Sequence, residues 1–387
     1  MPTLLLCSTL FFLLLALHPF LTYPASLRLL ARLRPRPIAQ GLSPHGVALC
    51  VCAYNEEAVI QAKVLNMLAL RELCPQLEIL VYVDAASDRT AEILRGFGAA
   101  LRVVVSPRRM GKTHGMNQLV GMTSAQCLVF SDANVMFAPD AIPALLRPFA
   151  DPEVGLVCGH LAFTDAVAAT ATSETGSAYW RLEEEIKRLE SATGSVIGAD
   201  GSIFAVRHGL HRAPPDDLID DLYISLMVLC GRRRVVRAED ALAFEAQVSR
   251  PGEEFRRKIR IGCQAFNVHR ALWGRLWQLG MLDRYKYVSH KLLRWLGAYL
   301  LAASGLCLLA GLAAAGAWLA LGVVVTAELL GLAALATLRD RRLLAIRSIL
   351  LAFVATGIGV WRSLHGVRFQ TWTSPASSRA EPSRASV

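Results

Sequence analysis

The sequence lacks any Cys-x-x-Cys pair, although nine cysteines occur among its 387 residues. Such pairs mark many zinc and redox sites, and an odd number of cysteines does not suit a disulfide framework. Cys50 and Cys52 alternate along an apolar run, so both fall on one face of a strand. Buried, unpaired cysteines of this kind are typical of a domain in a reducing compartment.

Motifs for nucleic-acid binding are also absent, despite a net charge of +10. The basic residues cluster at 28–36, 232–234 and 256–260, without the base-stacking aromatics or known motif that such binding needs. Two of these clusters adjoin apolar segments, where basic side chains more often face anionic lipid. We therefore expect membrane lipids as partners and no nucleic acid.

Charged residues are missing from the first apolar run, Leu4 to Leu21, which is long enough to cross a bilayer. The Met-Pro-Thr start lacks the basic residues of a cleaved signal peptide, and Arg28 to Arg36 follow the run. By the positive-inside rule, residues after the run stay in the cytoplasm. The sequence favours an anchor over 1–25 and a basic linker over 26–45, with a cleaved signal as the alternative.

The segment 46–250 has the pattern of an α/β domain, in which apolar runs of strand length alternate with amphipathic stretches. Regular alternation predicts a Rossmann-like, mainly parallel sheet flanked by helices. The predicted strands are Val47–Ala53, Leu77–Val83, Leu101–Val105, Cys127–Ser131, Val154–Cys158 and Ser202–Val206. The predicted helices are Glu56–Leu70, Thr90–Phe97, Lys112–Met122, Pro139–Phe149, Glu174–Ser191 and Leu222–Cys230.

The remainder of the chain is apolar, in keeping with 54% hydrophobic residues and a mean hydropathy of +0.40 overall. Basic and aromatic residues interleave over 251–288, which suits a helix in a membrane interface. Two or three transmembrane helices are predicted within 289–362, because Leu343–Trp361 could either span the bilayer or lie at its surface. The tail, 363–387, is predicted to be disordered.

Acidic residues within Glu174–Ser191 invite a functional interpretation that the sequence does not support. Glu183, Glu184 and Glu185 closely precede Lys187 and Arg188. Ion pairs three or four residues apart on one helix account for such a pattern. We assign these glutamates no chemistry.

Polar side chains follow three of the predicted strands. Asn55 and Glu56 follow the first, where Asn55 as a helix cap is the structural interpretation. Asp84 follows the second strand and has no evident structural role. Asp132 and Asn134 follow the fourth, where they either form a turn or bind a ligand. Ligands of open α/β sheets bind at the carboxyl ends of the strands, which favours binding.

Two further elements carry charge at helix starts. Gly111-Lys112 opens a helix but lacks the spacing of a P-loop. The stretch from Asp216 to Asp221 contains four carboxylates within six positions and precedes the last predicted helix of the domain. The helix dipole stabilises one or two of them. Four carboxylates this close repel one another unless a cation or hydrogen bonds intervene.

As an ordered set these elements resemble the family 2 glycosyltransferases, which have the GT-A fold. The resemblance covers about Val47 to Arg270 and includes the family's opening strand, acidic loop, Lys-x-x-Ala-Leu-Asn element, DxD strand, acceptor-side glycine-rich strand and "ED" helix. The matching stretches are VALCVCAYNEE, VYVDAASDRTAEIL, GKTHGMNQ, FSDANVMFAPDAI, GADGSIFAVRHGL and DDLYISLMVLCGRRR.

The resemblance implies a role for each matching residue. Asp221 would be the catalytic base, and Asp220 stands where the family has Glu. Asp132 and Asn134 would hold Mg²⁺ or Mn²⁺, which prefer hard oxygen ligands. The residues implied to bind the nucleotide sugar are Tyr54, Glu56, Asp84, Lys112, Asp132 and Arg260.

Two departures from the family pattern matter for function. The second acid of the DxD motif is Asn134, which is neutral. The Gln-x-x-Arg-Trp motif of processive members reads Arg257-Lys-Ile-Arg260-Ile261, so Gln and Trp are replaced. Arg260 is retained and could pair with diphosphate, but the loss of Trp disfavours a synthase of long polymers.

The sequence therefore predicts an inverting glycosyltransferase in the plasma membrane, with its catalytic domain in the cytoplasm. It would move sugar from a UDP-linked or related donor to a lipid-linked or growing saccharide, in exopolysaccharide or glycolipid synthesis. Asn134 and the altered Arg257–Ile261 motif motivate an alternative, a catalytically weak partner subunit of a polysaccharide complex. A nucleotidyltransferase is disfavoured, because no glycine-rich loop occurs near the amino terminus.

Overall fold

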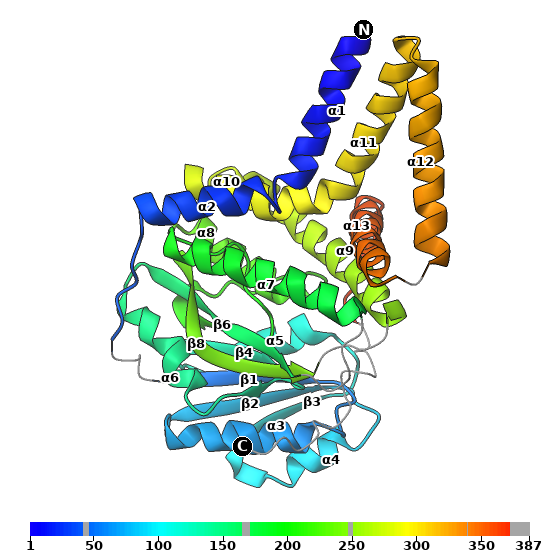
Figure 1. The fold of residues 1–387 in the computed structure, drawn as a ribbon. Coiled ribbons are helices and arrows are strands. Elements are labelled where there is room, and N and C mark those ends of the chain that lie inside the picture. The colour runs from blue at the N-terminus through cyan, green and yellow to red at the C-terminus, as the bar shows by residue number, and fades with distance from the viewer. Residues whose placement is uncertain (42–45, 165–170, 247–250, 339, 372–387) are drawn as a thin grey trace.

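The structure, a computed structural model, describes residues 1–41, 46–164, 171–246, 251–338 and 340–371. An α/β domain lies below a layer of helices, and three helices project from that layer away from the sheet (Figure 1). The projecting helices are α1 (Pro2–Leu17), α11 (Leu293–Ala314) and α12 (Trp318–Thr337).

The sheet has eight described strands in the order β3-β2-β1-β4-β7-β6-β8-β5. β3, β2, β1 and β4 are parallel, which confirms the predicted Rossmann-like half. β7 is antiparallel to both of its neighbours, so the sheet as a whole is mixed. The strands are β1 (Val47–Ala53), β2 (Leu77–Asp84), β3 (Arg102–Ser106), β4 (Cys127–Asp132), β5 (Met136–Phe137), β6 (Val154–Thr164), β7 (Ile203–Arg207) and β8 (Arg234–Ala246).

Both faces of the sheet are covered, and the sequence of β1 reflects this because it is apolar at every position. Val47, Leu49 and Val51 point into one hydrophobic cluster, and Ala48 and Cys50 point into the other. Helices α3 (Ile60–Ala69), α4 (Thr90–Arg95) and α6 (Ala141–Leu146) cover the first face. Helices α5 (Lys112–Val120), α8 (Asp220–Cys230) and α9 (Pro251–Leu276) cover the second.

Helix α7 (Ala171–Ala192) connects the domain to the amino-terminal part of the chain. Helix α2 (Thr22–Leu33) runs along it (Figure 1). Tyr23 and Leu27 pack against Ile186 and Leu189 in a small separate cluster. The amino-terminal helices are therefore attached to the α/β domain by a buried apolar contact.

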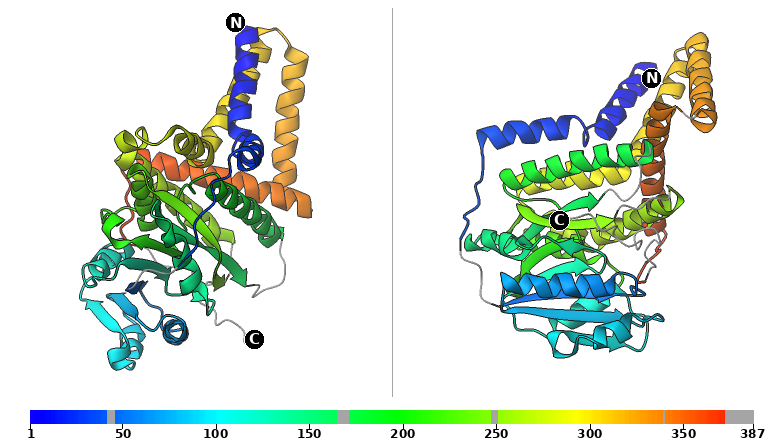
Figure 2. Two further views of the ribbon diagram at one scale, coloured as in Figure 1. Left: turned by 90° about the vertical axis from the view of Figure 1, so that its left-hand side faces the viewer. Right: turned by 60° about the horizontal axis from the view of Figure 1, so that its bottom comes forward.

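Three described helical segments are long and apolar enough to cross a membrane: Met281–Ala314, Trp318–Leu335 and Arg342–Leu364. Helices α1 and α2 meet the same test only as a pair bent by 58°. α13 (Arg341–Leu364) differs in direction, because it lies across the base of α1, α11 and α12 (Figure 2). A short helix, α10 (Met281–Tyr287), leads through a π-helical turn into α11.

The structure differs from the sequence predictions at several element ends. The helix predicted from Glu56 begins at Ile60. Neither β8 nor β5 was predicted. The stretch that forms β8 is rich in charge, and β5 has only 2 residues. The predicted disordered tail began at 363, but α13 ends at Leu364, and hydrogen bonds hold the segment after it at Val367, Phe369 and Gln370. Residues 372–387 of that tail lie outside the described part of the chain.

Candidate active site

Lys112 joins acidic residues from two different elements. Its Nζ lies 2.7 Å from Asp132 Oδ1, at the carboxyl end of β4. The same Nζ lies 3.7 Å from Asp220 Oδ2, at the start of α8. Burial alone would lower the pKa of Lys112, but Asp132, Asp220 and Asp221 raise it well above its ordinary value. The ammonium therefore stays charged and holds the carboxylates together.

Asp84 positions the turn that carries Lys112. Its carboxylate accepts hydrogen bonds from the backbone N–H of Met110 (2.6 Å) and of Gly111 (2.9 Å). Gly111 has φ +95, a conformation that favours glycine. The sequence suggested no structural role for Asp84, and the structure gives it one. A direct contact of Asp84 with nucleotide stays a prediction.

The two carboxylates at the start of α8 are placed differently. Asp220 is 1% exposed. Asp221 lies beside Gly201, where an added Cβ would come within 2.8 Å of Asp221 Oδ2 and 3.4 Å of Lys112 Nζ. Burial and the charge of Asp220 raise the pKa of Asp221 to about 7, with Lys112 acting against them. A carboxyl with such a pKa can accept a proton near neutral pH.

Asp132 and Asn134 lie on a turn whose neighbouring residues are hydrogen-bonded to a buried lysine. Lys63 Nζ donates to Ser131 Oγ at 2.9 Å and to the backbone carbonyl of Val135. Asn134 Nδ2 donates to Glu245 Oε1 at 3.0 Å. The turn is thus fixed on both sides. Neither Lys63 nor Glu245 was singled out from the sequence.

Tyr54 and Glu56 lie on the loop after β1. The Arg109 guanidinium stacks 3.5 Å from the centre of the Tyr54 ring. The backbone N–H of Glu56 donates to Thr90 Oγ1 at 2.8 Å. The prediction that Asn55 caps a helix is wrong, since Asn55 has φ +53 and its Oδ1 accepts from the Ser87 N–H. The loops after β1 and β2 therefore form one unit.

Arg260 reaches toward the same site from α9. Its Nη1 donates to Gln264 Oε1 at 3.2 Å. Burial and the charge of Arg257 lower the pKa of Arg260 to about 10, while Asp132 acts in the opposite direction. Arg260 is therefore a partly buried cation whose charge interacts with that of Asp132, as suits a diphosphate-binding residue.

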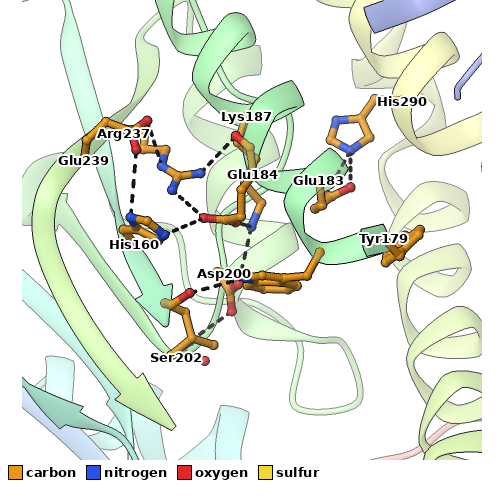
Figure 3. Close-up of polar contacts among 12 residues, drawn as sticks. His160, Tyr179, Glu183, Glu184, Lys187, Asp200, Ser202, Arg237, Glu239 and His290 are labelled. Carbon is orange, nitrogen blue, oxygen red and sulfur yellow. Dashed lines mark hydrogen bonds and ion pairs between the residues drawn. The ribbon is translucent and has the colours of Figure 1, made fainter. Parts of the chain in front are cut away.

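Acidic residues of α7 pair with residues far away in the sequence, and not only with neighbours on the helix (Figure 3). Glu185 does bond its helical neighbour Arg188. Glu184 also pairs with Arg237 of β8, and Glu183 accepts from His290 Nε2 at 3.0 Å. The interpretation of purely local pairing is wrong for these two residues. They connect α7 to the sheet and to the membrane helices.

Lys187 extends this network to the glycine-rich turn of the site. Its Nζ lies 3.2 Å from Glu184 Oε1 and 3.4 Å from Asp200 Oδ2 (Figure 3). Asp200 also accepts from the Ser202 N–H at 3.4 Å. The turn at Gly201, against which Asp221 packs, is therefore held by partly buried ionic contacts.

A segment after the last helix returns to the site. The carbonyl of Val367 accepts from Asn267 Nδ2 (3.0 Å), and that of Phe369 accepts from Gln264 Nε2 (3.1 Å). Gln370 Nε2 donates to the Met110 carbonyl at 3.0 Å. No pattern in the sequence predicted these contacts, because the partners lie 100 or more residues apart.

The donor set at the turn after β4 fits a hard divalent cation. Asp132 offers carboxylate oxygens and Asn134 an amide oxygen, the ligand types that Mg²⁺ and Mn²⁺ prefer. Within the described ranges, no three His, Cys, Asp or Glu residues form a group that could hold a metal ion. Mg²⁺ is often held by one or two carboxylates together with substrate phosphates, so an incomplete protein set is suitable.

A parallel half-sheet with acids at its carboxyl edge, together with an acid pair on a later helix, is the arrangement of the GT-A fold. Residues 48–212 match the Glycosyl transferase family 2 model. This part of the chain is a family 2 glycosyltransferase domain, related to those of polysaccharide synthases.

Two relatives show how far the similarity extends. An N-acetylglucosaminyltransferase of Rhizobium leguminosarum bv. viciae is 22% identical over 230 residues, which are 55% of this chain and 54% of the relative. A poly-beta-1,6-N-acetyl-D-glucosamine synthase of Staphylococcus epidermidis is 25% identical over 159 residues, 40% of this chain and 38% of the relative. The matched segments thus span about half or less of each relative's length.

A mannosyltransferase from Pyrobaculum calidifontis, solved in complex with GDP-Man and Mn²⁺, has a similar fold. The TM-score is 0.70, with 20% sequence identity over 93% of this chain and 99% of that chain. The similarity therefore extends beyond the sheet to the helices that flank it. The three described segments that are long and apolar enough to cross a bilayer indicate a membrane protein.

Proposed function

We propose that the protein is an inverting glycosyltransferase that moves a hexosyl group from a nucleotide sugar to a saccharide or lipid-linked acceptor. One observation carries the proposal: Lys112 binds both Asp132 and Asp220, from elements 88 residues apart, and so assembles one acidic site. The N-acetylglucosaminyltransferase relatives make UDP-N-acetylglucosamine the first donor to test, in polysaccharide or glycolipid synthesis.

Asp221 is the general base in this proposal. The acceptor oxygen attacks the anomeric carbon, and its proton passes to the Asp221 carboxylate. The bond from the anomeric carbon to the phosphate oxygen breaks, and its electron pair leaves with the nucleoside diphosphate. Attack opposite the leaving group inverts the configuration. A pKa near 7 suits Asp221 to this task.

The basic residues bind and stabilise the leaving group. Lys112 pairs with Asp132, and the charge of Arg260 also interacts with that of Asp132. A diphosphate that enters beside Asp132 would draw Lys112 from its carboxylate partners, because phosphate is the more highly charged anion. Mg²⁺ or Mn²⁺ bound by Asp132 and Asn134 would supply further positive charge for the leaving diphosphate. Tyr54 and Asp84 would line the nucleoside end.

The donor site would face the cytoplasm of a plasma membrane. Arg28, Arg32, Arg34 and Arg36 follow α1 and adjoin the side of the helical layer that carries the catalytic domain. Basic residues beside a span stay on the cytoplasmic side. Nucleotide sugars are cytoplasmic metabolites, so this orientation gives the site access to its donor.

The test is release of nucleoside diphosphate from a panel of UDP- and GDP-sugars by membranes containing the full chain. We expect turnover of one donor with membrane lipid extract present, loss of turnover with EDTA, and loss in Asp132→Asn. Asp240→Asn, on the half-exposed Arg147–Asp240 pair, is the control and keeps activity. Nucleotide binding without turnover of any donor would contradict the proposal and favour a non-catalytic partner subunit.

A further inference from the structure

The turn after β4 carries one carboxylate where its family has two. Asp132 supplies that carboxylate, and Asn134 holds the second position with a neutral amide. A divalent cation beside the turn would therefore meet half of the usual negative charge. Charge count is one of the main determinants of divalent-metal affinity in oxygen-ligand sites.

The fold brings another acid to this turn from a distant part of the sequence. β5 pairs antiparallel with β8, with Met136 opposite Phe244. In this register the residues just before Met136 lie beside those just after Phe244. Glu245 is the first such residue, and its Oε1 accepts from Asn134 Nδ2 at 3.0 Å.

The hydrogen bond from Asn134 holds the Glu245 carboxylate at this turn. Asp132 lies two residues before Asn134 on the same turn. The fold thus brings two carboxylates from distant parts of the sequence to one place. Two carboxylates close together in a partly buried place repel each other unless a cation lies near both.

The direction of the hydrogen bond also matters. Asn134 uses its amide nitrogen on Glu245, so its carbonyl oxygen remains the end that could ligate a cation. An aspartate in its place has no N–H and could not donate to Glu245. The amide therefore suits a neighbour that is itself a carboxylate.

We propose that Glu245 supplies the second carboxylate of the divalent-cation site, in place of the acid missing at position 134. Asp132 and Glu245 then bear the charge, and Asn134 orients Glu245 and adds a neutral oxygen. The inference rests on the proposed function, since that function requires the cation. It adds a residue that lies outside the 48–212 match to the family model.

The test measures Mn²⁺ binding directly, by electron paramagnetic resonance of free Mn²⁺ titrated with the purified full chain in detergent. Mn²⁺ is used alone and then with UDP or GDP. Glu245→Gln keeps the shape and the acceptor for Asn134 but removes the charge. We expect its Kd for Mn²⁺ to rise about tenfold or more, as for other residues that support a metal site.

The decisive variant moves the second carboxylate from position 245 to position 134. Asn134→Asp combined with Glu245→Gln has the same number of acids as the wild type, and its Kd should return to within a few-fold of the wild-type value. Asp240→Asn removes an acid from the same strand, on a half-exposed ion pair, and should leave the Kd unchanged. Unaltered Mn²⁺ binding in Glu245→Gln, or no recovery in the double variant, would overturn the inference.

The outcomes separate this inference from the proposed function. If wild type binds Mn²⁺ and only Asp132→Asn loses it, the cation site stands and Glu245 has no part in it. If the wild type binds no Mn²⁺ with either nucleotide, the chain has no such cation site, and the inference about Glu245 is overturned as well. Should Glu245→Gln not fold, Glu245→Asp keeps the charge but withdraws the oxygens, and an unchanged Kd there would also overturn the inference.

Discussion

The adjacent carboxylates at the start of α8 differ in exposure and in their surroundings. Asp220 is almost fully buried beside Lys112, and Asp221 packs on Gly201. Like charges at neighbouring positions push one of the two pKa values up. Burial and the charge of Asp220 raise the pKa of Asp221, the residue at the position that the resemblance gives to the family's base.

A pH dependence follows from this pair. Asp221 must be ionised to take the acceptor proton, so kcat/KM should rise with pH and level off above an apparent pKa near 7. The charge of Asp220 raises that pKa, so Asp220→Asn should move the midpoint to lower pH. The measurement is kcat/KM between pH 5 and 9 in both proteins. An equal or higher midpoint in the variant would contradict this account.

Gly201 allows a second prediction at the residue scale. Gly201→Ala would place a Cβ 2.8 Å from Asp221 Oδ2, closer than atoms normally approach, so the base must shift. A displacement of this kind costs about 10²-fold in rate. Gly209→Ala, whose Cβ would meet nothing within 4 Å, is the matched control and should keep its rate. Equal rates in both variants, measured as donor turnover, would show that the geometry at Gly201 is unimportant.

At the scale of elements, the sequence predicted those strands and helices that have a local hydrophobic pattern. β1, β2 and β4 are apolar at nearly every position because both sheet faces are covered, and acids at their ends were predicted to share one edge. β8 was missed because its charged residues pair within the fold, as Arg234 does with Asp151 at 3.1 Å. A local pattern carries no information about such a distant partner.

Similar reasons explain which site residues could be predicted. Lys112, Asp132 and Asp221 fall in motifs with fixed spacing, and the structure brings them together as expected. Glu245 and Gln370 meet the site only through tertiary contacts, across 111 and 260 residues. Neither stands in a motif, so only the fold reveals them.

The contact between α9 and α13 supports a prediction at the element scale. A Cβ at Gly359 would lie 2.6 Å from the Ile259 carbonyl and 2.8 Å from the Cys263 nitrogen, so the two helices touch backbone to backbone. Gly359→Ala should lower stability by about 1–3 kcal/mol through overpacking. Gly305→Ala in α11 meets nothing within 4 Å and is the control. Thermal unfolding in detergent measures both, and equal melting temperatures would contradict the close packing.

At the scale of the whole molecule, the course of α13 bears on membrane topology. α11 and α12 form a hairpin that leaves and returns to the helical layer (Figure 1). α13 lies across the base of that hairpin, and the segment after it bonds to Met110 in the catalytic domain (Figure 2). Both ends of α13 therefore lie on the catalytic side, and we expect this helix to lie along the interface without crossing.

Cysteine labelling can test this topology. Single cysteines at Leu338, Ala315 and His365 would report on the start of α13, the tip of the hairpin and the end of α13. With a membrane-impermeant thiol reagent, and after subtracting labelling of the native cysteines, Leu338→Cys and His365→Cys should react from the cytoplasmic side only. Ala315→Cys should react from the opposite side only. Labelling of Leu338→Cys and His365→Cys from opposite sides would show that α13 spans the membrane.

The whole account depends on Asp221 acting as a base in a sugar transfer, and one paired measurement tests that most directly. Donor binding and glycosyl transfer would be measured on the same preparations of wild type and Asp221→Asn, with the donor that the panel identifies. The account predicts that Asp221→Asn binds the donor as wild type does but transfers sugar about 10²–10⁴-fold more slowly. Transfer at the wild-type rate by Asp221→Asn would contradict it.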